Sequence, residues 1–132
     1  MAFSVHLGLR SKANTNQVDH LRRWVGQLSP SRTALVGGDF NSPETSPQIQ
    51  GASSAWVDTY RQANPQGDGH THTLRWPWGG VIRRQRLDYV FLVSEQAGWQ
   101  VLEARHLAAP GLAHSDHQAV MARLAPPAGP SG

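Results

Sequence analysis

Aspartate, asparagine and histidine side chains gather in three short segments of the sequence, and another histidine lies near its start. The segments are Gly38-Asp39-Phe40-Asn41, Arg86-Leu87-Asp88-Tyr89-Val90-Phe91 and Ser115-Asp116-His117, and the earlier histidine is His6. Carboxylates accept protons and bind hard cations, while imidazole exchanges protons near neutral pH. Together these residue types suit acid–base chemistry at a divalent cation.

Each segment alone is also compatible with a purely structural role. A Gly-Asp step is an ordinary turn, and an aspartate in a strand, such as Asp88, is usually an edge residue. A lone strand histidine such as His6 is more often a core residue. Only the joint occurrence of the segments favours a chemical site.

The chain contains no cysteine, which excludes disulfides, thiolate zinc sites and thiol nucleophiles. Any metal ligands must then be oxygen atoms or imidazole nitrogens. Eleven arginines and one lysine against nine acidic residues give a formal charge of +3, which is compatible with anionic partners. An arginine-rich, lysine-poor balance is equally typical of a GC-rich genome, so charge alone assigns no partner.

Two elements precede the first acidic segment. Residues 3–9 are apolar enough for a buried strand. A helix is predicted from Asn14 or Thr15, either of which is a good N-cap, to Leu28, and Pro30 marks its end. The helix would carry four apolar residues on one face, at spacings of three and four: Val18, Leu21, Val25 and Leu28.

Apolar runs and turn residues predict the remaining elements. Residues 33–38 read as a central strand that delivers Asp39 and Asn41 at its carboxyl end. Residues 42–47 are expected to be a loop or one helical turn, 56–61 a short helix and 64–69 turns. Further strands are predicted over residues 70–74, 86–93, 99–107 and 118–124.

These elements predict one domain over residues 1–124, of mixed α/β (α+β) type, in which a layered mixed β-sheet has flanking helices. Residues 125–132 are proline, glycine and small residues and are expected to be a disordered tail. No apolar run approaches the roughly 18 to 20 residues that cross a bilayer, and the start lacks the order of a signal peptide. We expect a cytoplasmic protein without membrane insertion.

The order of the motifs, from His6-Leu7 through GDFN and RLDYVFL to SDH, resembles the C-terminal half of the endonuclease/exonuclease/phosphatase superfamily. The resemblance runs from about Val5 to Leu124. It implies half of a DNase I-like four-layer sandwich, and a divalent-metal-dependent phosphodiesterase or nuclease that hydrolyses phosphate esters. The implied cofactor is Mg²⁺ or Mn²⁺, and nucleic acid is the favoured substrate.

The resemblance assigns roles to the histidines. His117 would contact the scissile phosphate or orient the attacking water, and Asp88 would pair with it. A carboxylate bonded to one ring nitrogen fixes the tautomer and raises the basicity of the other nitrogen. His6 would stabilise the phosphate or protonate the leaving group.

The resemblance also assigns the metal ligands, which are Asp39, Asn41 and Asp116. Asp39 would accept a proton from the nucleophilic water, and Asn41 would hold water or a phosphate oxygen. These two should face the same side, because they lie two residues apart in an extended segment. His70 and His72 could share a strand face as a metal pair, although a structural role is favoured for them.

Two parts of the family pattern are missing from this sequence. They are an asparagine on the first strand and the main metal-binding glutamate, since none of Glu44, Glu95 and Glu103 lies in a matching segment. Two alternatives to an enzyme follow: a catalytically impaired remnant that binds nucleic acid or phosphate without turnover, or a truncated fragment. The intact acidic and histidine residues favour the enzyme.

A second group of residues is predicted to contact substrate. Trp76 and Trp78, followed by Arg83, Arg84 and Arg86, could form a hairpin that stacks on bases and binds phosphates. The alternatives are a packed loop with solvated arginines, or aromatic residues at a lipid interface.

Half of a sandwich would leave the inner face of its sheet apolar and uncovered. A homodimer related by a two-fold axis, sheet against sheet, is the expected way to cover that face.

Overall fold

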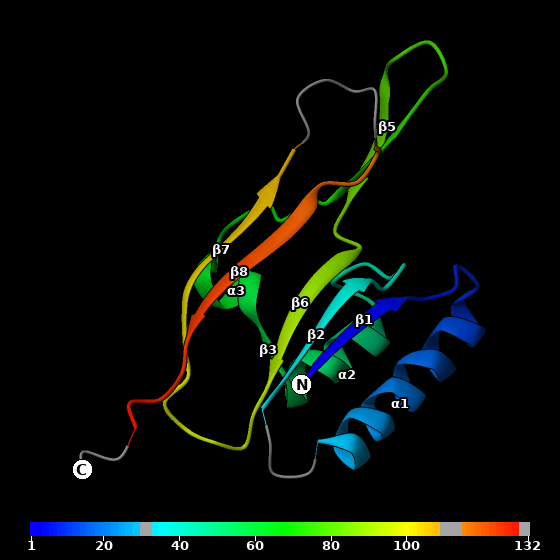
Figure 1. Ribbon diagram of the computed structural model, residues 1–132. Coiled ribbons are helices and arrows are strands. Elements are labelled where there is room, and N and C mark those ends of the chain that lie inside the picture. The colour runs from blue at the N-terminus through cyan, green and yellow to red at the C-terminus, as the bar shows by residue number, and fades with distance from the viewer. Residues whose placement is uncertain (30–32, 109–114, 130–132) are drawn as a thin grey trace.

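The computed structural model describes residues 1–29, 33–108 and 115–129 (Figure 1). In chain order its elements are β1 Ala2–His6, α1 Ser11–Leu28, β2 Ala34–Asp39, α2 Pro47–Ala55, β3 Val57–Asp58, α3 Thr59–Ala63, β4 His72–Arg75, β5 Val81–Gln85, β6 Asp88–Val93, β7 Gln100–Leu107 and β8 Ala119–Ala125. None of the described helices is both long and apolar enough to span a bilayer.

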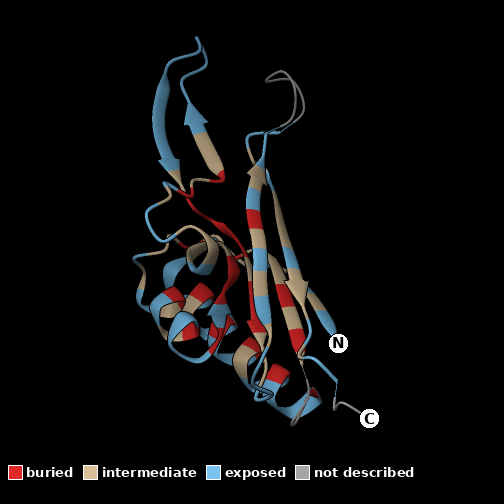
Figure 2. Cartoon of the chain, turned by 90° about the vertical axis from the view of Figure 1, so that its left-hand side faces the viewer, coloured by how far each residue is buried: buried red, intermediate tan, exposed pale blue. Residues whose placement is uncertain are grey.

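A four-stranded sheet lies at the centre of the fold. Its strand order is β1-β2-β6-β3, with β1 parallel to β2 and the other two pairings antiparallel. β4 pairs with β5, and β7 pairs with β8, in two separate antiparallel hairpins. Helices α1 and α2 cover one face of the central sheet, and the β7–β8 hairpin packs on β6 and α3 (Figures 1 and 2). The predicted mixed, layered fold class is confirmed.

The core forms between the central sheet and helices α1 and α2. The predicted apolar stripe of α1 is confirmed at Val18, Leu21 and Val25, which are buried. Leu28, the last residue of the helix, is exposed instead. The apolar spacing therefore correctly predicts which face of α1 packs on the sheet, but it is wrong for the last turn of the helix.

Phe40 anchors the first acidic segment in this core. Its ring is fully buried and meets Tyr89 and Phe91 edge to face, with centroids 5.4 Å apart in both pairs. Its backbone N–H donates to the carbonyl oxygen of Leu87 at 2.8 Å. The residues on either side of Phe40 are therefore held at a fixed position at the end of β2.

Asn14 does not cap α1 as predicted, because the helix already begins at Ser11. Its side chain is buried and donates from Nδ2 to the carbonyl oxygens of Gly8 and Phe40, at 2.8 and 2.7 Å. Its Oδ1 accepts a hydrogen bond from Ser42 Oγ at 2.5 Å. Asn14 therefore satisfies the backbone of two loops near the predicted site, and this tertiary use overrides its preference for a helix terminus.

Two further segments differ from the prediction. α2 runs from Pro47 to Ala55, and the sequence predicts no element over residues 48–55, directly after the expected loop at 42–47. The helix carries only two buried side chains, Ile49 and Ala52. Two buried positions are too few to produce a helical period. Residues 56–61, expected to be a short helix, first form β3, and Asp58 then caps α3 by accepting the Arg61 N–H at 3.2 Å.

The predicted strands are present with ends displaced by a few residues. Ala125, expected in the tail, belongs to β8, and residues 126–129 have no regular secondary structure. Residues 130–132 of the predicted tail, and Pro30, lie outside the described ranges.

Arg86 is buried in this fold, which corrects its prediction as a substrate contact. Its Nη1 and Nη2 donate to the two carboxylate oxygens of Asp58 at 2.7 and 2.5 Å. Its guanidinium also lies over the rings of Tyr60 and Tyr89, with Glu44 at 3.2 Å. A buried guanidinium that is paired bidentately cannot reach a phosphate, so Arg86 is a structural residue.

Candidate active site

Three of the predicted residues form one row across the central sheet. His6 pairs in register with Asp39 between β1 and β2, and Asp39 pairs with Asp88 between β2 and β6. Because Val36 and Phe91 fill the core on the helix side, strand alternation turns the row to the opposite face. His6 Nε2 lies 3.9 Å from Asp39 Oδ2, and the His6 side chain is 81% exposed.

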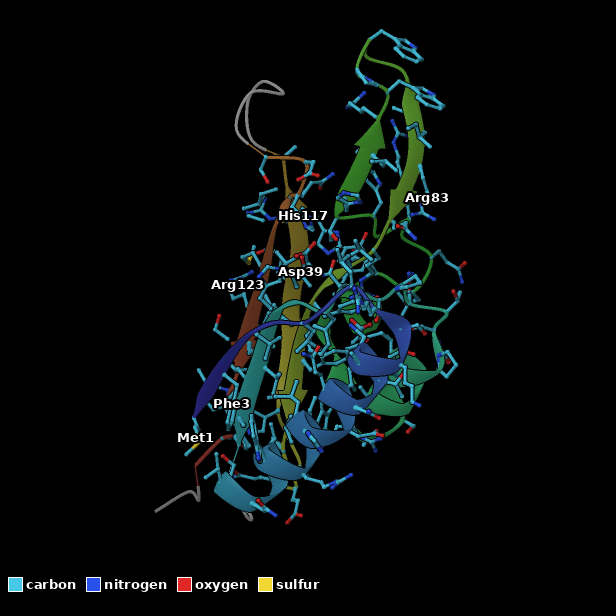
Figure 3. All side chains as sticks on the ribbon, turned by 90° about the vertical axis from the view of Figure 1, so that its right-hand side faces the viewer. Met1, Phe3, Asp39, Arg83, His117 and Arg123 are labelled. Atoms are coloured by element: carbon cyan, nitrogen blue, oxygen red, sulfur yellow. The ribbon has the colours of Figure 1, made fainter. Side chains whose placement is uncertain are left out.

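His117 joins this row from the segment that precedes β8. Its Nδ1 donates to Asp88 Oδ2 at 2.7 Å, and its Nε2 lies 3.9 Å from Asp39 Oδ2 (Figure 3). Thr71 Oγ1 donates to the same oxygen of Asp88 at 2.7 Å. The hydroxyl therefore holds the carboxylate, and the carboxylate holds the imidazole with Nε2 on the side of Asp39.

Thr71 is a site residue that the sequence reasoning does not find. It is fully buried, and its Oγ1 also accepts the backbone N–H groups of Leu87 and Asp88 at 3.0 and 3.1 Å. The sequence predicts only that Thr71 lies in a strand, over residues 70–74. That signal does not distinguish a buried hydrogen-bonding threonine from an exposed one.

The pKa of His117 is raised above its ordinary value of 6.5. Burial acts to lower this pKa, but the hydrogen bond to Asp88 and the charges of Asp88, Asp39 and Asp116 together raise it by more. The folded protein therefore favours the imidazolium form. The resulting stabilisation is fully present below the unfolded pKa of about 6.5 and is lost as the pH rises through the folded pKa.

Asn41 does not continue an extended segment as predicted. Its φ is 46°, in the left-handed region, and its backbone N–H donates to Asp39 Oδ1 at 2.8 Å. Its Nδ2 donates to the carbonyl oxygen of Leu7 at 2.6 Å. Asn41 thus ties the chain after β2 to the chain after β1, and Asp39 keeps Oδ2 on the side of His117.

Asp116 belongs to a different cluster from Asp39. Within the described residues, two sets of three side chains have ligand atoms within 4.8 Å of one another: Asp39, Asp88 and His117, and His72, Asp116 and His117. The predicted ligands Asp39 and Asp116 therefore fall in separate sets that share one histidine. Asp116 is 66% exposed, and its Oδ2 lies 3.2 Å from His72 Nε2.

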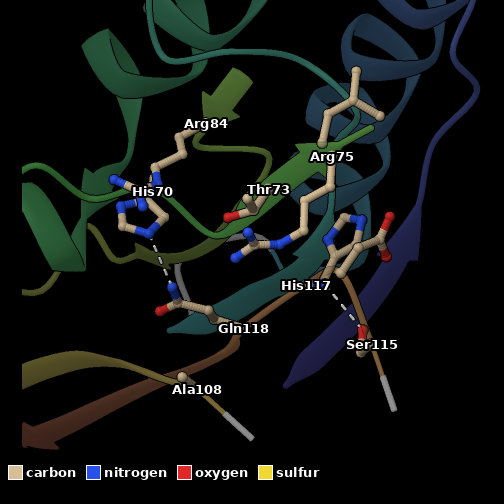
Figure 4. Close-up of a pocket in the computed structure, with 10 residues that line it drawn as sticks. His70, Thr73, Arg75, Arg84, Ala108, Ser115, His117 and Gln118 are labelled. Atoms are coloured by element: carbon tan, nitrogen blue, oxygen red, sulfur yellow. Dashed lines mark hydrogen bonds between the residues drawn. The ribbon is translucent and has the colours of Figure 1, made fainter. Parts of the chain in front are cut away.

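A hollow of about 400 Å³ opens beside His117 (Figure 4). Arg75 and Arg84 line it from β4 and β5, so of the three predicted arginines only Arg84 contributes, and Arg75 was not predicted. His70 also lines it and contacts Gln118, at 3.1 Å between Nε2 atoms, instead of pairing with a second histidine. Guanidinium groups beside an imidazole suit a phosphate group.

β4 and β5 form an exposed arm that projects from the body of the protein (Figures 1 and 2). Near its tip, Trp76 and Trp78 stack with ring centroids 5.2 Å apart, and they are 48% and 79% exposed. Arg83 and Arg84 lie on the same arm and are exposed (Figure 3). The arm is a hairpin, as one of the sequence alternatives predicts, and not a packed loop.

Known proteins match this chain by structure but not by sequence. No protein-family model matches the sequence, and no curated protein matches it. A solved endonuclease/exonuclease/phosphatase from Bacteroides vulgatus matches with a TM-score of 0.66 and 22% identity, over 94% of this chain and 47% of that one. The chain has the fold of the endonuclease/exonuclease/phosphatase family.

Two other structures agree with this family fold. The human nocturnin catalytic domain with bound sulfate gives a TM-score of 0.68 at 20% identity, over 92% of this chain and 45% of that one. The TDP2 protein of D. rerio, complexed with a single-stranded DNA product, gives 0.73 at 15% identity, over 95% and 56%. The chain spans about half the length of the proteins it matches, as the sequence resemblance predicts.

Replacement of Asp88 by asparagine is expected to lower the pKa of His117. The amide keeps the size of the side chain but removes the negative charge that stabilises the imidazolium, and it replaces one of the two acceptor oxygens by an NH2 donor. An NMR titration of the His117 ring protons measures the change. Asp68→Asn, which removes the carboxylate beside His70, is the matched control. An unchanged pKa in Asp88→Asn would contradict the pairing.

Proposed function

We propose that this chain carries the catalytic centre of a divalent-metal-dependent phosphodiesterase that hydrolyses phosphate ester bonds in nucleic acid. The contact that carries the proposal is the pair formed by His117 and Asp88, held 3.9 Å from the carboxylate of Asp39. An oriented imidazole beside a second carboxylate is an acid–base arrangement. The family fold agrees with it.

The carboxylates fit a hard cation by their chemistry. Asp39 uses Oδ1 to accept the Asn41 N–H, which leaves Oδ2 as a ligand, whereas Asp88 Oδ2 already accepts two hydrogen bonds. Asp39 would therefore bind Mg²⁺ or Mn²⁺ through Oδ2, with the oxygen atom of Asn41 as a further donor. Asp116 lies in the other set of ligand groups, so its exposed side chain would have to turn towards Asp39 to join them as the third ligand. When bound, the ion supplies charge neutralisation at the phosphoryl group and a lower pKa for water.

Different side chains of the protein would accept and donate the protons of the reaction. In the proposed reaction a water oxygen attacks phosphorus and passes a proton to Asp39 Oδ1, the carboxylate oxygen that does not ligate the ion, as the bond from phosphorus to the leaving oxygen breaks. His117, with its raised pKa, presents an N–H to the phosphate, and the exposed His6 gives a proton to the leaving oxygen. Proton gain and loss balance between Asp39 and His6.

The arm supports nucleic acid as the substrate class. Arg75 and Arg84 line the hollow beside His117, while Arg83 and the two stacked tryptophans lie along the arm. Cations that follow a phosphate backbone, next to exposed aromatic rings on which bases stack, are typical of single-strand binding. Among proteins of this fold, TDP2 was solved with a single-stranded DNA product, and another is a mannosyl-6-phosphatase of Bacteroides thetaiotaomicron.

Hydrolysis of plasmid DNA and of bis-p-nitrophenyl phosphate tests the reaction. Turnover with Mg²⁺ or Mn²⁺ is expected, and it should be lost in EDTA. Activity should fall by roughly 10²-fold or more in His117→Ala, because the N–H that faces the phosphate is removed. Asp116→Ala is expected to lose activity through the metal. His20→Ala and Asp19→Ala, both exposed on α1, are controls. No turnover above the site variants would instead support the binding remnant.

Truncation of the arm tryptophans tests the substrate class. Trp76→Ala with Trp78→Ala is expected to raise KM for single-stranded DNA by roughly tenfold, since stacking contributes about 1 to 3 kcal/mol per base. Hydrolysis of bis-p-nitrophenyl phosphate should not change, because that substrate is too small to extend from the hollow beside His117 to the two tryptophans. Trp24→Ala, at an exposed position on α1, is the control. Equal KM values, with binding of phospholipid vesicles lost in the double variant, would favour a lipid substrate.

A homodimer through the free sheet face is also part of this proposal. Phe3 and Val5 point to the helix side of the sheet. The opposite face, which carries the row of His6, Asp39 and Asp88, therefore also carries three other side chains: Ser4 and the half-buried Leu35 and Val90. Ser4→Arg is expected to convert dimer to monomer in sedimentation velocity, and Ser53→Arg on α2 is the matched control. A monomeric wild-type protein would contradict the dimer.

A further inference from the structure

His72 lies directly across from His117, although the two residues are far apart in the sequence. Backbone hydrogen bonds of 2.7 and 3.0 Å flank the pair, one on each side. Residues flanked in this way form a non-hydrogen-bonded antiparallel pair, whose side chains come close together on one face. The two imidazole rings accordingly have centroids 4.8 Å apart.

Asp116 completes a set of three ligands with these histidines. Its Oδ2 lies 3.2 Å from His72 Nε2, and one ligand atom from each of the three residues lies within 4.8 Å of the other two. The His72 side chain is only 14% exposed, and its Nδ1 is buried without a hydrogen-bond partner in the described residues. The His72 ring therefore has one nitrogen beside Asp116 and one without a protein partner in the described residues, so it keeps a nitrogen available for a ligand.

His117 is already oriented as metal-binding histidines are. Its Nδ1 donates to Asp88, and Thr71 holds that carboxylate in turn, which leaves Nε2 to face outward from the pair. Histidine ligands of metals almost always donate their other ring N–H to a carboxylate, a carbonyl or water, and such partners strengthen binding. The cluster thus contains three ligand groups, and Asp88 and Thr71 orient one of them, His117.

We propose that His72, Asp116 and His117 form a binding site for a dication of the zinc class. Two imidazole nitrogens and one carboxylate oxygen suit Zn²⁺, whereas Mg²⁺ takes oxygen ligands. Three protein ligands leave one coordination position open. The site goes beyond the proposed function, because that function needs no imidazole ligand and leaves His72 unused.

Occupancy by Zn²⁺ would have a consequence for catalysis, and this consequence rests on the proposed function. Nε2 of His117 cannot ligate Zn²⁺ and present a proton to phosphate at the same time. Zn²⁺ is therefore expected to inhibit hydrolysis that Mg²⁺ or Mn²⁺ supports. Binding itself does not depend on turnover, so the two proposals can fail separately.

Titration of the metal-free protein with Zn²⁺ alone, followed by calorimetry, tests the site. One Zn²⁺ per chain is expected, with a higher Tm. Affinity should fall roughly tenfold or more in His72→Phe and in Asp116→Asn. Asp116 is exposed, so its variant should fold even if His72→Phe does not. His20→Phe and Asp19→Asn make the same changes on the exposed side of α1 and should bind normally.

Either of two results would overturn the zinc site. One is the absence of Zn²⁺ binding by the wild-type protein, and the other is equal affinity in Asp116→Asn and in the α1 controls. Zn²⁺ binding without any hydrolysis would support this site and reject the proposed function. Hydrolysis without Zn²⁺ binding would do the reverse.

Discussion

The carboxylate of Asp88 is the place where the separate parts of this structure meet. It stands at the first residue of β6, is almost buried, and accepts hydrogen bonds from Thr71 and His117 with one oxygen. Thr71 directly precedes β4 and His117 closely precedes β8, so this oxygen joins the central sheet to both hairpins. A buried carboxylate needs compensating donors, which explains why these segments converge on it.

The polar residues near Asp88 are positioned by aromatic packing and by buried hydrogen bonds to the backbone. Phe40 fixes the end of β2 by packing edge to face against the rings of Tyr89 and Phe91, and Asn14 satisfies the loop backbone around it. Arg86, two residues before Asp88, is used entirely in a buried pair with Asp58. Two charged residues of one short motif thus have different roles, since Arg86 is structural and Asp88 belongs to the candidate site.

The helices decide which face of the central sheet carries the candidate site. Helices α1 and α2 cover one face of the sheet, so the row of His6, Asp39 and Asp88 lies on the other face, beside the β4–β5 arm. His117 belongs to both clusters of ligand groups, one rich in carboxylates and one rich in imidazoles. In the two proposals the same ring would either donate a hydrogen bond to phosphate or ligate a metal ion through nitrogen, so the bound ion would decide between these roles.

The sequence by itself determined the residue types of the site, the apolar stripe of α1 and the runs that became β2 and β6, because these depend on local order and period. It did not determine register, which aligns His6 and Asp39 with Asp88, since a pairing between distant strands leaves no local pattern. The same limit hid Thr71 and the burial of Arg86. Their roles depend on partners far along the chain, and only the tertiary structure supplies those partners.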